Sequence, residues 1–180
     1  MKKGLHNFFE NKGRLEILAF NYLIIDKDLS DYLFDYLKQT DSLISLRFTK
    51  TNLLAYGNAM KVLSNILIAL KNLKELSFVK CSLDLDKCKI LADSLMRMKK
   101  LQIFRLQDQK NIGLGLASII YNLSFSPNLL FLDLGEIEIS RNTKDIIENV
   151  VSLYKMLRIN SSVEILKLTK IYNLNPQLNK

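Results

Sequence analysis

An apolar triplet with the spacing Leu-x-x-Leu-x-Leu occurs six times along the 180 residues of this chain. The copies are Leu15-x-x-Leu18-x-Phe20, Leu43-x-x-Leu46-x-Phe48, Leu73-x-x-Leu76-x-Phe78, Leu101-x-x-Phe104-x-Leu106, Leu129-x-x-Leu132-x-Leu134 and Val163-x-x-Leu166-x-Leu168. Their first residues lie 28, 30, 28, 28 and 34 positions apart. A period of this length indicates repeated strand and helix units that bury their apolar faces against their neighbours. We therefore expect one α/β domain over residues 1–180, a solenoid of about six repeats.

Amphipathic helix patterns follow the triplets. After the first triplet, Leu29, Leu33 and Leu37 recur at helical spacing, which is typical of a helix with one buried face. The pattern after the fifth triplet is the longest and predicts a helix from Ser140 or Thr143 to about Arg158. This longer helix accounts for the 34-residue interval.

The two ends of the array differ from its interior, because a terminal repeat has no neighbour on its outer side. Residues 1–14 place Leu5, Phe8 and Phe9 at helical spacing, so we expect a short helix that caps the first repeat. The repeats extend over residues 15–172. Residues 173–180 form a tail without a helix pattern, so the C-terminal face is closed only by this tail or by a partner.

The third repeat also carries a longer motif, Leu-x-x-Leu-x-Leu-x-x-Asn/Cys-x-Leu, which it completes with Cys81 and Leu83. On this motif the chain resembles leucine-rich repeat proteins of the ribonuclease-inhibitor type over residues 14–172. The resemblance implies an open horseshoe with parallel strands on its concave face and helices on its convex face. The Asn/Cys position is occupied in the other repeats by Leu23, Thr51, Gln109, Ile137 and Ile171. We therefore expect those loops to lack the family's ladder of side-chain to backbone hydrogen bonds.

Residues that could carry catalysis or hold a cofactor do not form a set. His6 is the only histidine, and it lies in the expected cap. Cys81 and Cys88 are seven positions apart with no second pair, whereas zinc takes four ligands, so we interpret them as core thiols. Gly113 and Gly115 form only Gly-x-Gly and meet neither phosphate-binding fingerprint. We expect no enzyme activity, no cofactor and no metal.

The charge of the chain favours an acidic partner. The net charge is +8 and the isoelectric point about 9.4, although a compositional bias toward Lys and Asn explains the same numbers. No apolar run approaches the roughly 20 residues that a membrane span needs. Two cysteines and no apolar segment after Lys2 and Lys3 favour a cytoplasmic protein without a membrane anchor.

Strand alternation predicts which side chains face outward from the sheet, because successive residues point to opposite faces. The expected outward pairs are Ile17/Ala19, Ser45/Arg47, Glu75/Ser77, Ile103/Arg105, Phe131/Asp133 and Ile165/Lys167. Within this set Ile103, Phe131 and Ile165 should form one apolar row, since neighbouring strands lie about 4.8 Å apart. Such a row indicates an interface with an aromatic anchor. The alternative is that the three side chains only shield each other across the sheet.

Charged residues flank this row. A basic region comprises Arg47, Lys50, Lys74, Lys80 and Arg105, and an acidic region beside it comprises Asp108, Asp133, Glu136 and Glu138. Mixed charge suits a protein surface better than nucleic acid, which requires a continuous positive track. The candidate partner-binding residues are Arg47, Lys50, Lys80, Ile103, Arg105, Phe131, Asp133, Ile165 and Lys167.

These observations predict a non-enzymatic scaffold that binds a partner protein through the concave face. The partner surface should be acidic and partly apolar, and the weakly closed C-terminal end suits a subunit of a larger assembly. One alternative is a GTPase regulator, because the Ran GTPase-activating protein has the same repeat type. Another is an RNA-binding module that uses the basic repeats.

Overall fold

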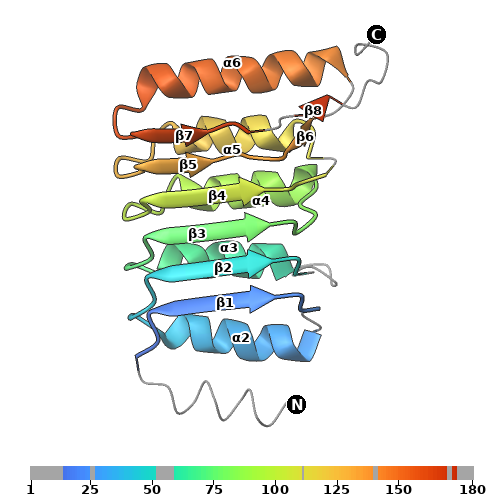
Figure 1. Ribbon diagram of the computed structural model, residues 1–180. Coiled ribbons are helices and arrows are strands. Elements are labelled where there is room, and N and C mark those ends of the chain that lie inside the picture. Colours follow the sequence, from blue (N-terminus) through green and yellow to red (C-terminus); the bar gives the residue numbers. More distant parts are fainter. Residues whose placement is uncertain are drawn as a thin grey trace.

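The computed structural model describes residues 14–24, 27–51, 59–110, 112–139, 142–169 and 172–173. Six parallel strands form one sheet in the order β1-β2-β3-β4-β5-β7, shown in Figure 1. Their bounds are β1 Ile17–Asn21, β2 Ser45–Thr49, β3 Glu75–Val79, β4 Ile103–Gln107, β5 Phe131–Asp133 and β7 Ile165–Lys167. A second sheet pairs two short parallel strands, β6 (Glu138–Ile139) and β8 (Tyr172–Asn173).

Five helices of the described chain lie on one face of the large sheet, as Figure 1 shows. They are α2 (Lys27–Gln39), α3 (Ala59–Ala69), α4 (Leu85–Leu95), α5 (Gly115–Leu123) and α6 (Thr143–Ile159). Each of α2 to α5 turns a continuous set of apolar residues toward the sheet. Local capping sets two of the helix starts, because Asp84 accepts a hydrogen bond from the Lys87 N–H and Asn142 accepts one from Lys144. None of the described helices combines the length and the apolarity needed to cross a membrane.

The core lies between the sheet and the helix layer. Equivalent residues of neighbouring strands stand in register, so that Leu18, Leu46, Leu76, Phe104 and Leu132 form one buried row. A second buried row begins with Phe20, Phe48 and Phe78, whose rings stack with centroid distances of 5.5 and 5.3 Å. The spacing of the triplets therefore becomes two continuous apolar rows across the sheet.

A turn residue with positive φ follows each of the strands β1 to β5. The residues are Tyr22, Lys50, Lys80, Asp108 and Glu136, with φ between 48° and 57°. Each donates its N–H at 2.6–3.1 Å to a carbonyl of the next strand or of the residues just after that strand. Non-glycine residues adopt this left-handed conformation at a steric cost, which the hydrogen bonds of these five residues offset. The stacking of the strands thus determines the turns as well.

The residues that follow three of these turn positions show that the expectation of a missing hydrogen-bond ladder was wrong at Thr51 and Gln109. The hydroxyl of Thr51 donates to the carbonyl of Phe20 at 3.1 Å. The thiol of Cys81 does the same to Phe48 at 3.3 Å, and the amide of Gln109 to Phe78 at 3.2 Å. Thr51 and Gln109 therefore continue the side-chain to backbone ladder that we expected only at Cys81.

The α/β class is confirmed, with six parallel strands and helices on one side. The finer expectation of a six-repeat horseshoe is not established by this arrangement alone. The expected cap helix with Leu5, Phe8 and Phe9 lies outside the described residues, as do residues 174–180 of the tail.

Candidate protein-binding face

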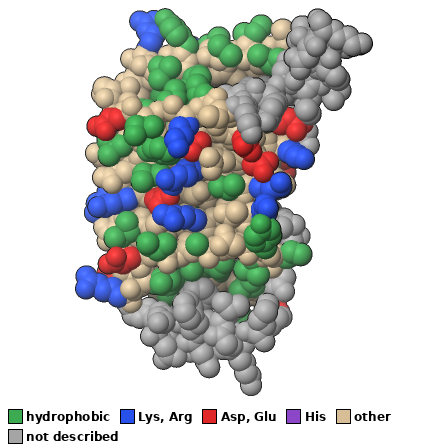
Figure 2. All heavy atoms as spheres, in the orientation of Figure 1, with side chains coloured by type: hydrophobic (Ala, Val, Ile, Leu, Met, Phe, Trp, Pro, Cys, Tyr) green, Lys and Arg blue, Asp and Glu red, His purple; other side chains and the backbone are tan. Residues whose placement is uncertain are grey.

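The face of the large sheet opposite the helices carries two outward rows of side chains. One row is Ile17, Ser45, Glu75, Ile103, Phe131 and Ile165, and the other is Ala19, Arg47, Ser77, Arg105, Asp133 and Lys167. Both rows agree with the outward pairs predicted from strand alternation. Figure 2 shows basic and acidic side chains close together over the middle of this face. We call these two rows the open sheet face.

Glu75 is the centre of the charges on the open sheet face. One of its carboxylate oxygens accepts from Arg47 Nη2 at 2.5 Å and from Ser45 Oγ at 3.0 Å, and the other accepts from Arg105 Nη1. The Glu75 side chain is only 8% exposed. Burial, the largest single effect, raises the pKa of Glu75, but the hydrogen bonds from Arg47 and Ser45 and the charges of both arginines outweigh it and leave the pKa below its usual value. Glu75 is therefore ionised near neutral pH and holds two guanidinium groups in place.

Phe131 lies between two cations on the same face. The Arg105 guanidinium is 5.1 Å from the centre of the Phe131 ring, and the Lys167 ammonium is 5.2 Å from it. A cation at this distance from an aromatic face is attracted by the ring electrons. Asp133 lies beside them, almost fully buried, and accepts from Gln107 Nε2 at 2.9 Å and from the Gly135 N–H at 3.1 Å. The result is a partly buried aromatic ring with positive charge on both sides.

The predicted apolar row is present as a geometric feature. Ile103, Phe131 and Ile165 stand directly beside one another on β4, β5 and β7. Ile103 and Phe131 are half-buried, while Ile165 at the end of the sheet is 51% exposed. Mutual shielding across the sheet therefore accounts for the first two residues better than for the third.

Lys50 and Lys80 belong to the turns rather than to the open sheet face. Lys50 Nζ donates to Tyr22 Oη at 2.8 Å, and Lys80 pairs with Asp108 at 3.2 Å. The charges are thus interleaved instead of forming a separate basic and acidic region. Glu75, which we did not include among the candidate residues, is the clearest omission. In the register Arg47 and Arg105 stand opposite Ser77, two positions along β3 from Glu75, so their diagonal proximity to Glu75 was a signal available from the sequence.

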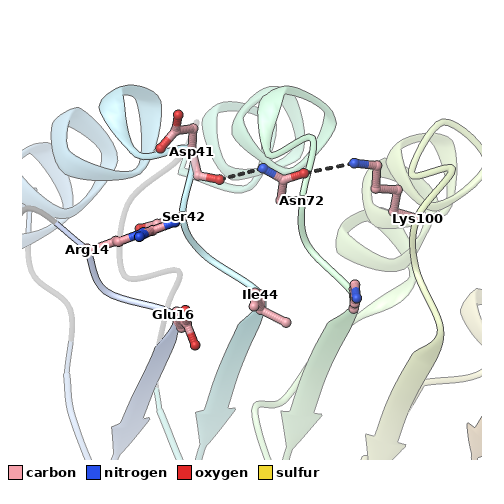
Figure 3. A pocket seen from close by; sticks show the side chains of 8 residues that line it. Arg14, Glu16, Asp41, Ser42, Ile44, Asn72 and Lys100 are labelled. Atoms are coloured by element: carbon pink, nitrogen blue, oxygen red, sulfur yellow. Dashed lines mark hydrogen bonds between the residues drawn. The ribbon is translucent and has the colours of Figure 1, made fainter.

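Lys74 also lies away from the basic region in which we placed it. It lines a hollow of about 410 Å³ at the edge where the strands begin, shown in Figure 3. There Asn72 donates to the carbonyl of Asp41 at 2.7 Å and accepts from Lys100 Nζ at 2.8 Å. These bonds join three successive loops, so Asn72 has a structural reason to be there.

No group of three or more His, Cys, Asp or Glu side chains within the described ranges is placed to hold a metal ion. Cys81 and Cys88 are buried free thiols. Burial raises the pKa of both, in the case of Cys88 to about 12, so neither is a thiolate near neutral pH.

Comparison with known proteins finds similarity in structure only. No protein-family model matches the chain, and a search of curated proteins returns no match. Among solved structures, the chain is similar to leiomodin-1 actin-binding site 2, with a TM-score of 0.56 and 16% identity over 77% of this chain and 78% of that one. It is also similar to the tropomodulin C-terminal domain of Caenorhabditis elegans, with a TM-score of 0.57 and 10% identity over 87% of this chain and 93% of that one. At these identities the likeness shows the fold alone.

The comparisons correct the family expectation. The neighbours are leiomodin and tropomodulin domains, so assignment to the ribonuclease-inhibitor type of leucine-rich repeat protein is wrong. The solenoid of about six repeats that we expected from the triplet period conflicts with these neighbours and is not confirmed. The functions that we predicted are corrected with it: the general interaction scaffold, the GTPase regulator and the RNA-binding module. A parallel sheet backed by helices, with a period near 28 residues, is compatible with more than one family.

Proposed function

We propose that this chain is a non-enzymatic protein-binding domain and that its partner is actin. The observation that carries the proposal is the likeness of its backbone to a domain named as an actin-binding site, which extends over most of both chains. Because fold likeness alone does not determine function, the proposal also needs a surface with suitable chemistry. The proposal of actin as partner agrees with the cytoplasmic location expected from the sequence.

The open sheet face offers that chemistry. Binding energy at protein interfaces concentrates in a few aromatic and arginine side chains near the centre of the contact. Here Phe131 is the aromatic anchor, and Arg105 is held next to it by Glu75. An arginine whose position is already set loses little freedom on binding, which favours affinity. The partner surface that fits is apolar at its centre, opposite Phe131, and acidic around it, opposite Arg47, Arg105 and Lys167.

Actin binding is tested directly by co-sedimentation of the full chain with actin filaments and by titration of monomeric actin. The key variant is Phe131→Ala, with Tyr121→Ala as the matched control. Tyr121 is an aromatic residue on α5 that is 50% exposed on the helix side of the molecule. We expect the control to bind as the wild type does and Phe131→Ala to bind about 10-fold or more weakly.

A second pair of variants tests the charges of the open sheet face. Lys167→Glu should weaken binding, and Lys89→Glu on the exposed surface of α4 should not, although both change the net charge equally. If neither form of actin binds the wild type, the proposed function is wrong. If actin binds but neither Phe131→Ala nor Lys167→Glu weakens it, the open sheet face is not the binding surface.

A further inference from the structure

Helix α6 differs from the other helices in what it leaves exposed. Its buried residues are only Asn149 and Met156, whereas α2, α3, α4 and α5 each bury several apolar side chains. Figure 1 shows α6 as the last helix of the layer, next to α5 on one side. On its outer side are large apolar side chains with more than half of their surface exposed: Ile147 at 56%, Val150 at 59%, Tyr154 at 59% and Leu157 at 53%.

The spacing of these four residues is that of a helix-pairing seam. Ile147, Val150, Tyr154 and Leu157 are separated by three, four and three positions. This is the alternation found where two helices pack against each other side by side. Val151, 41% exposed, widens the same stripe. A contiguous exposed stripe of this kind indicates a surface that is covered when the protein functions.

We propose that a second copy of this chain covers the stripe, with the two α6 helices packed antiparallel about a twofold axis near Ser152. In that register Ile147 lies opposite Leu157 of the second copy, and Val150 lies opposite Tyr154. The twofold axis repeats both contacts, so Ile147 meets a side chain of equal size and the smaller Val150 meets the larger Tyr154. The four apolar residues of one copy thereby pack against the same four residues of the other, as an isologous interface requires.

The charges beside the stripe support the same register. Glu148 and Lys155 are seven positions apart and therefore lie on nearly the same side of the helix, next to the apolar stripe. An antiparallel pairing centred near Ser152 brings Glu148 of one copy beside Lys155 of the other, twice in the dimer. Glu148 and Lys155 are both exposed in the single chain. Opposite charges across the interface therefore favour this antiparallel pairing.

The sheet ends at the same place. The carbonyls of Lys74, Gln102 and Leu130, just before β3, β4 and β5, each accept two N–H groups from the next strand. Glu164 occupies the equivalent position before β7. Because β7 is the last strand in the order of the described sheet, no further strand of that sheet can donate N–H groups to the Glu164 carbonyl. Within the described residues no strand pairs with the outer side of β7, and proteins normally cover such a strand edge. A second copy at this end would cover both features.

The test is the molar mass of the full chain in solution, measured by sedimentation equilibrium from roughly 1 to 500 µM, a range that detects micromolar dissociation constants. We expect the mass to rise to twice the 20.8 kDa of one chain. Tyr154→Asp should keep the protein monomeric. Tyr121→Asp is the matched control, because Tyr121 is an exposed tyrosine on the neighbouring helix α5, and it should leave the dimer intact. Circular dichroism checks that both variants fold.

A charge exchange distinguishes a second copy from any other cover. Glu148→Lys alone and Lys155→Glu alone should each raise the dissociation constant about 10-fold, because each places like charges together at both sites. An equimolar mixture of the two variants should dimerise again, since opposite charges then meet at both sites. A wild type that stays monomeric, or a dimer that survives Tyr154→Asp, overturns the proposal. The cover of the stripe would then be residues 174–180 or a different protein.

Discussion

Replacing Phe48 by leucine should destabilise the protein by about 2–5 kcal/mol, because Phe48 is the middle ring of the stack that begins with Phe20. Its side chain is fully buried and contacts one ring on each side, at 5.5 and 5.3 Å between centroids. Loss of buried volume accounts for about 1–2 kcal/mol. Each stacked pair adds about 0.5–1.5 kcal/mol beyond the buried area, so the loss of two pairs adds about 1–3 kcal/mol.

Phe104 provides the matched control for this prediction. It is also fully buried in the same sheet, but no described ring stacks on it. Phe104→Leu should therefore cost only the volume term, about 1–2 kcal/mol. The assay is equilibrium unfolding in urea at neutral pH, with a double-mutant cycle between Phe48 and Phe78 to isolate one stacked pair. Equal losses for Phe48→Leu and Phe104→Leu, within about 0.5 kcal/mol, would refute the contribution assigned to stacking.

Three further predictions concern single side chains. Glu75→Gln should lower the free energy of unfolding by about 1–3 kcal/mol at pH 7. Folding lowers the pKa of Glu75, so the stabilisation by its carboxylate is present above the unfolded pKa of about 4.3 and is lost as the pH falls toward the folded pKa. The free energy of unfolding of Glu75→Gln should therefore depend less on pH in this range than that of the wild type. An equal pH dependence of the two proteins would contradict this cause. Gly115→Ala would place a methyl group 2.6 Å from Cβ of Cys88. We expect the free energy of unfolding to fall by about 1–2 kcal/mol, because the cost of overpacking exceeds the gain in helix propensity. An unchanged melting temperature would contradict this. Ser82→Gly should raise the unfolding free energy by about 0.5 kcal/mol, because exposed Ser82 has a φ of 53°, and a lower urea midpoint would show that the residue is not strained.

The strand register could be predicted from the sequence because two simple rules determine it. The triplets fix which residues face the helices, and alternation then fixes the outward pairs such as Ile103 and Arg105. Glu75 could have been recognised by the same rules, since Arg47 and Arg105 flank its strand on either side in the sheet. What the rules could not show is that one carboxylate would bind both guanidinium groups, because this depends on side-chain reach.

The loop ladder was missed because the prediction relied on residue identity instead of hydrogen-bonding capacity. The loop needs a donor that reaches the carbonyl of the preceding strand, and the hydroxyl of Thr51 and the amide of Gln109 meet that need as Cys81 does. Leu23 and Ile137 have no such donor.

The sequence led us to expect a weakly closed C-terminal face, but it did not show which residues of α6 would be exposed there. Its apolar residues have the spacing of a core helix, and the sequence does not say whether a neighbour lies beyond it. A family could not be assigned correctly for a related reason, because a period near 28 residues describes the packing of strands and helices and not an ancestry.

The turns after the strands have a consequence for where the chain can accommodate extra residues. From the first residue of each triplet to the turn residue with positive φ, the distance is seven positions in all five cases, from Leu15 and Tyr22 to Leu129 and Glu136. All variation in the intervals therefore falls between a turn and the next triplet. One residue inserted within a strand would reverse every side chain after it, whereas a longer loop on the helix side leaves the register unchanged. A peptide tag or a reporter domain is therefore best inserted on the helix side, away from the strands and their turns.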